Sequence, residues 1–500
     1  MNKPHPVAPW RSLCAAALLF TALASMGQAQ ALQPQRSSAP LQSLLELGTS
    51  TLTTRLPTIK AWKLTQDTKV LFVENHALPM IDVQISFAAG SNQDGDSPGL
   101  AAMVLSLFNE GSEVKDANAL AKGFDSLGVE LGNGINKERS YFTLRSLSDA
   151  NVRDPAMRLL SEMLSRPGFT VEGQRRVKNE LLAQLKREHD APHALAQAQI
   201  YDQLYTGHPF TRSVHGSAQS IELINTAQLR AFYRRAYTAA NAQIVIVGDL
   251  TVQQAQSLSR TLADALPTGP ALAEPPPSAD SPHTAKTLHI EDEAAHSLLM
   301  LAQNALPSQH PDAVAIRAGN VIFSQILNEH LREIHSVTYG VISDIPPAKG
   351  TTPWTISLNT PSRYSLSALA LIKTLFARFL QEGPNQQELD DIKQFLLRAL
   401  PQLTASNLEM RQELALISRF DQPLDFNYKI QQAHALTREQ IKAAMNRHFS
   451  ADGWVSVTVG PSVAQLPLPV RTAGEATPEH ACTPTNQQTL NRIQRLGAGP

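Results

Sequence analysis

Residues 97–112 read Ser97-Pro98-Gly99-Leu100-Ala101-Ala102-Met103-Val104-Leu105-Ser106-Leu107-Phe108-Asn109-Glu110-Gly111-Ser112, and no other segment says more about the architecture of this chain. The apolar pattern predicts a helix over residues 99–110. Residues i, i+3 and i+4 of a helix share one face, so we expect Ala102, Leu105 and Ser106 to lie together. Taken alone, the segment is an ordinary buried helix.

The same segment resembles the zinc-binding helix of the insulinase-like (pitrilysin) metallopeptidases, whose motif is approximately P-G-[LIV]-A-H-x-x-E-H-x-x-F-x-G-[ST]. The frame of that motif is present as Pro98, Gly99, Leu100, Ala101, Gly111 and Ser112. Its two His positions fall on Ala102 and Ser106, and its Glu position falls on Leu105. Catalytic zinc needs nitrogen, sulfur or carboxylate donors and a base for its water. The resemblance therefore implies a peptidase-like fold whose zinc positions are emptied.

Three further segments match the family and extend the resemblance over roughly residues 55–465. They are Tyr205-Thr206-Gly207-His208-Pro209-Phe210 with Gly216, Arg235-Ala236-Tyr237 through Asn241 to Leu250, and Leu331-Arg332-Glu333-Ile334-His335-Ser336-Val337-Thr338-Tyr339-Gly340-Val341. The second departs from the pattern because Ala239 replaces a proline. The third is the most specific of the three.

The resemblance implies that Arg332 and Tyr339 bind the backbone of a peptide substrate near the scissile bond. Arginine offers a rigid fork of donors, and tyrosine offers a hydroxyl on an apolar body. The alternative is that Arg332 pairs at a helix end with Glu333 or Asp344 and that Tyr339 belongs to the core.

Two other family positions point to lost chemistry. Glu180 stands where the third zinc ligand would be, and we interpret it as a relic because a lone carboxylate does not hold catalytic zinc. The substrate-side Asn-Ala pair of the family's edge strand is replaced by residues 131–134, Leu131-Gly132-Asn133-Gly134. We expect no metal and no cofactor in this chain.

The remaining histidines do not form an obvious metal motif. His330 and His335 are five residues apart, about 140° around a helix. His189 and His193 are separated by a turn that Pro192 breaks, and we expect them at solvated helix ends. We expect His208 to be a structural hydrogen-bonding residue. Neither a G-x-S-x-G segment nor a nucleotide-binding loop appears in a strand–turn–helix context.

Composition excludes several classes of protein. The 500 residues are enough for two domains with full cores. The 43 Lys and Arg residues balance 44 Asp and Glu residues, so no basic excess suggests a nucleic-acid partner. The only cysteines are Cys14 and Cys482. If Cys14 is removed with a signal peptide, no internal disulfide can form.

The N-terminus has the pattern of a secretory signal. Lys3 and Arg11 precede an apolar run over residues 13–26, and small residues predict cleavage after Ala29 or Ala31. We therefore predict a signal peptide at 1–31, a flexible leader at 32–54 and a polar tail at 471–500. The mature chain should be exported, with the periplasm as its expected destination, and should hold no stable membrane span.

A duplicated α+β fold is predicted for the mature chain. Residues 177–182 are echoed by 392–397, and the strand at 244–248 by one at 455–460. Prolines between 267 and 285 indicate a linker between an N-terminal domain, 55–266, and a C-terminal domain, 286–470. Each domain should be an antiparallel sheet backed by helices, and the resemblance implies that the two close as a clam-shell.

These features favour a non-catalytic subunit of an exported, heterodimeric zinc metallopeptidase. The zinc would lie in a homologous partner, and this chain would help to bind an extended peptide substrate. The alternative is an independent peptide-binding or scaffold protein of the cell envelope without a peptidase partner. A third possibility is an active peptidase with an unrecognised site, which stoichiometric zinc and chelator-sensitive activity would reveal.

Overall fold

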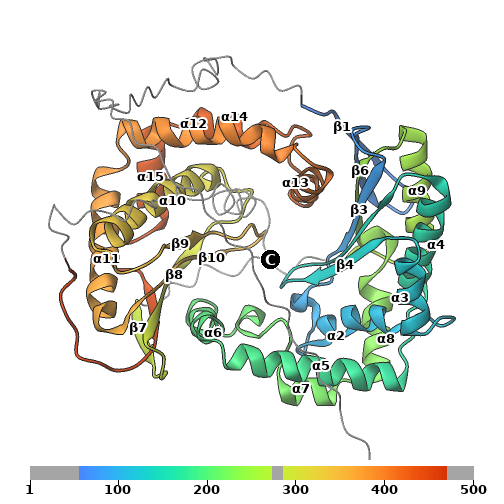
Figure 1. The fold of residues 1–500 in the computed structure, drawn as a ribbon, viewed down its shortest axis with the longest axis horizontal. Helices are drawn as coiled ribbons and strands as arrows, with labels where there is room; N and C mark the ends of the chain where they lie inside the picture. The colour runs from blue at the N-terminus through green and yellow to red at the C-terminus, as the bar shows by residue number, and fades with distance from the viewer. Residues whose placement is uncertain (1–55, 273–284, 470–500) are drawn as a thin grey trace, which may run out of the picture. The chain divides into compact units, whose positions relative to one another are not determined.

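The computed structural model describes residues 56–272 and 285–469. The predicted signal peptide, the leader, most of the proline-rich linker and the tail lie outside the described residues. Each of the two described segments contains one sheet with its helices (Figure 1). We call residues 56–272 the first half and residues 285–469 the second half.

The first half contains a six-stranded sheet in the order β1-β2-β6-β3-β5-β4. Its strands are β1 (Ile59–Lys63), β2 (Lys69–Glu74), β3 (Met80–Phe87), β4 (Glu130–Ile135), β5 (Ser140–Leu147) and β6 (Ala242–Gly248). Its α-helices are α2 (Leu100–Leu107), α3 (Ala117–Asp125), α4 (Ala150–Ser165), α5 (Val171–His189), α6 (Pro192–Leu204), α7 (Ala218–Leu223), α8 (Thr226–Ala236) and α9 (Val252–Asp264). Short 3-10 turns are η1 (Ser91–Gln93), η2 (Phe108–Glu110), η3 (Pro209–Thr211) and η4 (Ala239–Asn241).

The second half contains a five-stranded sheet in the order β7-β11-β8-β10-β9. Its strands are β7 (Lys286–Ile290), β8 (His296–Ala305), β9 (Ile342–Asp344), β10 (Thr352–Pro361) and β11 (Val455–Val459). Its helices are α10 (Ala313–Asn328), the π-helix η5 (Glu329–Ile334), the 3-10 turn η6 (Ser362–Tyr364), α11 (Ser365–Glu382), α12 (Gln386–Leu403), α13 (Asn407–Arg419), α14 (Tyr428–His434) and α15 (Arg438–His448).

The two sheets share one topology once β1 is set aside. In each, the first and last strands of the half pair in parallel, as Val70↔Ile244 and Leu288↔Val457 do, and the other pairs are antiparallel. This equivalence confirms the predicted duplication. The sheets are antiparallel as predicted except for one parallel pair in each, β2 with β6 and β7 with β11, which joins strands that lie far apart in the chain.

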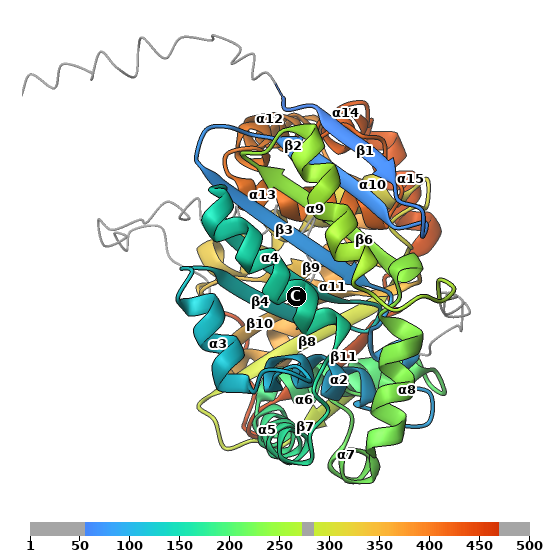
Figure 2. The ribbon, with the colours of Figure 1, turned by 90° about the vertical axis from the view of Figure 1, so that its right-hand side faces the viewer.

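The central strands of the first sheet are buried on both faces. Val70 and Phe72 of β2 face a core built with α2, α4, α8 and α9, whereas Leu71 and Val73 face the opposite side. Alternation along a strand places consecutive side chains on opposite faces, so both faces require a cover. Figure 2 shows α4 and α9 in front of this sheet.

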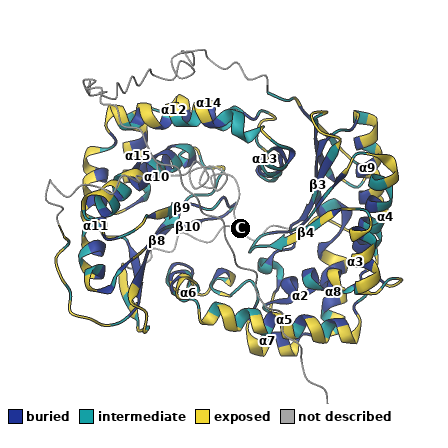
Figure 3. Ribbon diagram, in the orientation of Figure 1, coloured by how far each residue is buried: buried dark blue, intermediate teal, exposed yellow. Residues whose placement is uncertain are grey.

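Each half supplies the helix that covers the second face of the other half's sheet. Helix α13 contributes Met410, Leu414 and Ile417 to the cluster with Leu71 and Val73. Reciprocally, α6 packs on β8 and β11 through a cluster that includes Ala196, Ile200, Leu204, Met300 and Val457. Both are the third α-helix after the fourth strand of their half. In Figure 3 α13 and the strands are largely dark blue, whereas α5 and α7 carry much yellow. Over the described segments, no helix is both long enough and apolar enough to cross a bilayer.

Candidate functional site

The face of α2 that corresponds to the zinc site is part of the hydrophobic core. Ala102 and Leu105 are 2% and 4% exposed and belong to the main core cluster of the first half. Ser106 is half-buried on the same helix. An alanine methyl and a leucine side chain offer no lone pair to a metal and no base to its water. The geometry therefore confirms a buried, apolar helix where the family motif holds zinc.

The glycines of the motif frame are required by backbone packing, not by a metal. Gly99 caps α2 with φ = 90°, and a Cβ there would lie 2.7 Å from the carbonyl oxygen of His215. Gly216 has φ = 78°, and its Cβ would lie 2.3 Å from the carbonyl oxygen of Pro98. Both conformations favour glycine. These contacts explain how the frame survives although the zinc ligands are gone.

A buried carboxylate at the start of α2 was not found by sequence reasoning. Asp94 is 6% exposed and accepts hydrogen bonds from the backbone N–H groups of Gly99 and Ala101, each at 2.8 Å. Burial raises the pKa of Asp94 to about 7, against these two hydrogen bonds, which favour the charged form. Asp94 therefore satisfies free amides at the helix N-terminus. The sequence signal is an acidic residue shortly before the predicted helix.

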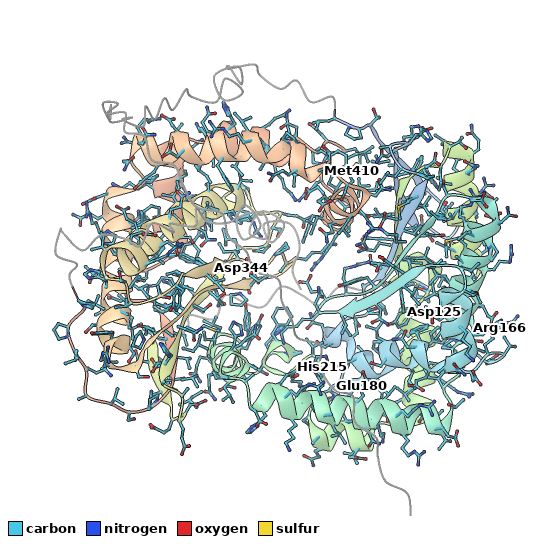
Figure 4. All side chains as sticks on the ribbon, viewed as in Figure 1. Asp125, Arg166, Glu180, His215, Asp344 and Met410 are labelled. Atoms are coloured by element: carbon cyan, nitrogen blue, oxygen red, sulfur yellow. The ribbon has the colours of Figure 1, made fainter. Side chains whose placement is uncertain are left out.

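Glu180 is exposed on α5, the helix that packs against α2 (Figure 4). It forms no ion pair with any other described residue. The ion pair in this region joins Arg176 on α5 to Glu110 on η2, the short turn that follows α2. Without nitrogen or carboxylate donors on α2, Glu180 cannot complete a zinc site.

The other matched motif residues of the first half form hydrogen bonds that stabilise the fold. The Tyr237 hydroxyl accepts from Ser140 Oγ at 3.0 Å, and burial raises its pKa to above the usual range for tyrosine. The amide of Asn241 donates to the Ala236 carbonyl at 2.6 Å. His208 Nδ1 accepts from the Phe210 N–H at 3.2 Å and caps η3, which confirms its predicted structural role.

Arg332 lies in the π-helix that extends α10. The backbone N–H of His335 donates to the carbonyl of His330, the wide spacing of such a turn. The Arg332 side chain is 38% exposed, and its Nε lies 3.2 Å from Glu333 Oε1. This pairing with Glu333 is the one expected under the structural alternative. It is made by exposed side chains, so it holds the guanidinium weakly.

Tyr339 is 99% exposed, so the alternative that places it in the core is wrong. Its loop is nevertheless anchored, because Val337 and Val341 on either side are 2% and 0% exposed. The N–H of Val341 donates to Asn328 Oδ1 at 3.0 Å. An anchored loop thus presents an aromatic side chain entirely to solvent.

The remaining predicted positions do not converge on a site. His189 and His193 are exposed at the adjoining ends of α5 and α6, as expected. His335 Nδ1 lies 2.7 Å from the carbonyl oxygen of Pro469, so it is engaged away from His330. On β4, Asn133 Nδ2 donates to Asn109 Oδ1 at 3.3 Å.

Two family models match this chain. The model described as insulinase (peptidase family M16) matches residues 69–218, and the model described as the peptidase M16 inactive domain matches residues 224–396. The first covers β2 through the start of α7, including α2. The second includes α10, η5 and the segment of Arg332 and Tyr339.

Similar proteins support the same assignment. The crystal structure of a peptidase M16 inactive domain from Pseudomonas fluorescens is 38% identical, covers 82% of this chain and 100% of its own, and has a TM-score of 0.78. The non-peptidase homolog YmxG of Helicobacter pylori is 26% identical over 66% of this chain and 77% of that protein. The periplasmic protease PqqL of Escherichia coli shares the fold at 16% identity and TM-score 0.68, over 82% of this chain and 46% of PqqL. With the apolar face of α2, these similarities indicate a non-enzymatic chain that belongs to the M16 (insulinase) peptidase family as an inactive homologue.

Proposed function

We propose that this chain is the non-catalytic subunit of an exported, heteromeric zinc metallopeptidase and helps to bind extended peptide in the cleft of a zinc-bearing homologue. The single observation that carries the proposal is Tyr339, a fully exposed aromatic side chain on an anchored loop. Exposure of one large side chain between two buried valines gains nothing for the stability of the isolated fold. Contact with a peptide or a partner would bury it.

The chemistry around Tyr339 suits an extended peptide. Arg332 can donate to peptide carbonyl oxygens, and the Tyr339 hydroxyl can donate or accept. β9 begins three residues after Tyr339 and is one of the two edge strands of the second sheet. Edge strands pair with extended peptides through backbone hydrogen bonds. The zinc and the base for its water would come from the partner, because α2 supplies neither.

Export is part of the proposal and rests on the N-terminal sequence pattern. The signal at residues 1–31 combines basic residues, a short apolar run and small residues before the cleavage position. The described residues contain no membrane-spanning helix. PqqL, whose fold is similar, is described as a periplasmic protease, which agrees with an envelope location for this chain.

The test is purification of the tagged mature chain from its native envelope fraction, with mass spectrometry of co-purifying proteins. We expect an M16 homologue with an intact H-x-x-E-H helix at near one-to-one stoichiometry. In the reconstituted pair, Arg332→Ala and Tyr339→Ala should each lower peptide cleavage at least about tenfold without preventing assembly. Arg378→Ala is the matched control, because Arg378 also pairs with an exposed glutamate. Unchanged cleavage in both variants would refute the assigned roles.

The second candidate is an independent peptide-binding or scaffold protein of the envelope. This candidate is favoured by β4, in which Gly132, Asn133 and Gly134 replace the substrate-side pair of the family. The side chain of Asn133 is also hydrogen-bonded to Asn109. Recovery of the chain without a homologue, together with peptide binding by the isolated chain, would support this candidate over the first.

A further inference from the structure

We propose that His310, Asp312 and His448 form a Zn²⁺ site in the second half of the chain, distinct from the emptied position on α2. One ligand atom from each residue lies within 4.8 Å of the others. Two imidazoles and one carboxylate are a ligand set that zinc accepts, with a fourth position open to water. His448 meets the other two residues only in the folded chain, because it is 136 residues from Asp312, whereas His310 is two residues from Asp312.

Helix ends position Asp312 and His448, whereas His310 lies in the segment that precedes α10. Asp312 is the N-cap residue of α10, and His448 is the last residue of α15. The two helices pack against each other, and their cores share Ile316, Ile322, Ile441 and Met445. The rings of His310 and His448 meet edge to face with centroids 5.2 Å apart. Ligands on packed helices are held more rigidly than ligands on loops.

The Asp312 carboxylate has a ligand oxygen to spare. His448 Nε2 lies 2.8 Å from Asp312 Oδ2, and Arg447 also pairs with Oδ2. Within the described residues both contacts use Oδ2, which leaves Oδ1 as the natural ligand oxygen.

Zinc would replace hydrogen bonds that the metal-free protein makes. His310 Nδ1 accepts the backbone N–H of Asp312 at 3.1 Å, and His448 donates to the carboxylate. Coordination needs a free lone pair on each imidazole. His310 must therefore release the hydrogen bond from the Asp312 N–H, and His448 must release the proton that it donates to the carboxylate. We therefore expect a dissociation constant in the micromolar range.

Arg447 competes directly with a metal cation for Asp312. Its side chain is 57% exposed, so it can turn toward water when zinc binds. This arrangement makes a specific prediction: removal of the guanidinium should strengthen zinc binding. A histidine cluster that binds metal adventitiously, without Asp312, would not respond to Arg447.

A cavity of about 430 Å³ adjoins the site. Its wall includes His310, Pro311, Arg317 and Tyr428, and it lies between α10, α12 and α14. Since His310 belongs to both the ligand cluster and this wall, we expect water or a small anionic ligand to reach the open coordination position from this cavity.

The test is a titration of the chelator-treated mature chain with ZnCl₂, followed by calorimetry and by thermal unfolding. We expect one Zn²⁺ per chain and a rise in the unfolding temperature, because zinc would bind only the folded state. His448→Ala and Asp312→Asn should each weaken binding more than about tenfold, and Arg447→Ala should strengthen it about threefold or more. Mg²⁺, which prefers oxygen ligands, should not compete.

His289→Ala is the matched control, since His289 also contacts a carboxylate, that of Glu291, at 3.2 Å but in an exposed place. It should bind zinc as the wild type does. If His448→Ala does not fold, His310→Gln replaces it, because glutamine keeps an acceptor for the Asp312 N–H. The proposal would be overturned if the chain bound no zinc or if His289→Ala abolished binding. It would also be overturned if the His448 and His310 variants still bound zinc as the wild type does. These results do not depend on whether a peptidase partner exists.

Discussion

The carboxylate of Glu138, in the turn between β4 and β5, forms an ion pair with the guanidinium of Arg419, the last residue of α13. The two side chains are only 17% and 12% exposed. Glu138 Oε1 also accepts the backbone N–H of Lys349 at 3.2 Å. Burial lowers the pKa of Arg419 to about 10. One carboxylate of the first half thus binds two donors of the second half.

Removal of this carboxylate should strongly destabilise the chain. Glu138→Ala leaves the Arg419 guanidinium buried without its counter-ion, and we expect a loss of about 3 kcal/mol in the free energy of unfolding. Urea denaturation measures this loss of unfolding free energy. Glu382→Ala, which breaks the exposed pair with Arg378, should cost less than about 1 kcal/mol. Equal losses in the two variants would mean that the Glu138 pair is not effectively buried.

The reciprocal helices should contribute comparably to stability. Leu414 on α13 and Ile200 on α6 are both fully buried against the other half's sheet. Leu414→Ala and Ile200→Ala should each lower the free energy of unfolding by about 3 kcal/mol through lost contacts and a cavity. Leu397→Ala on α12, where the side chain is 40% exposed, is the control and should cost less than about 1 kcal/mol. Either core variant behaving like the control would contradict the observed packing.

Restoring the residues of the zinc motif should destabilise the chain more at Leu105 than at Ser106. Leu105→Glu places a carboxylate among core side chains without a partner and should cost about 3 kcal/mol. Ser106→His, at a half-buried position, should cost about 1 kcal/mol. Thermal and chemical unfolding of the two single variants test this order. If both substitutions are tolerated equally, the α2 face is less tightly packed than its burial indicates.

Asp94 should give the chain a pH-dependent stability. Its folded-state pKa of about 7 exceeds the unfolded value of about 3.9, so between these values the folded state binds more protons. Its contribution to stability is therefore present at low pH and is lost as the pH rises through about 7. From about pH 8 to 5.5, the wild type should gain about 1–2 kcal/mol more than Asp94→Asn.

The measurement is urea unfolding at both pH values. Asp96→Asn serves as the control, because Asp96 is an exposed carboxylate two residues away. It should keep the pH dependence of the wild type. Identical pH dependence in wild type and Asp94→Asn would exclude Asp94 as the titrating group.

Much of the secondary structure was predictable from local patterns. The helix predicted over 99–110 is α2 at Leu100–Leu107 followed by η2 at Phe108–Glu110, and the strand predicted at 244–248 is β6 at Ala242–Gly248. Apolar periodicity carries this information. Strand β4 has no clear alternation because Gly132 and Gly134 interrupt it, so only the family resemblance indicated an edge strand at residues 131–134. The parallel pair in each sheet was missed because its two strands lie far apart in the chain.

The sequence by itself determined the chemistry that is absent from α2, because Ala102 and Leu105 cannot bind zinc in any fold. The sequence also contains the glycine frame, but the close approach of Gly99 to His215 and of Gly216 to Pro98, which explains these glycines, is a contact between distant segments. Only the tertiary structure decided that Tyr339 is exposed and that Asp312 and His448 meet across 136 residues. The physical reason is that residue type fixes what a side chain can do, whereas its burial and its partners depend on which distant surfaces pack together.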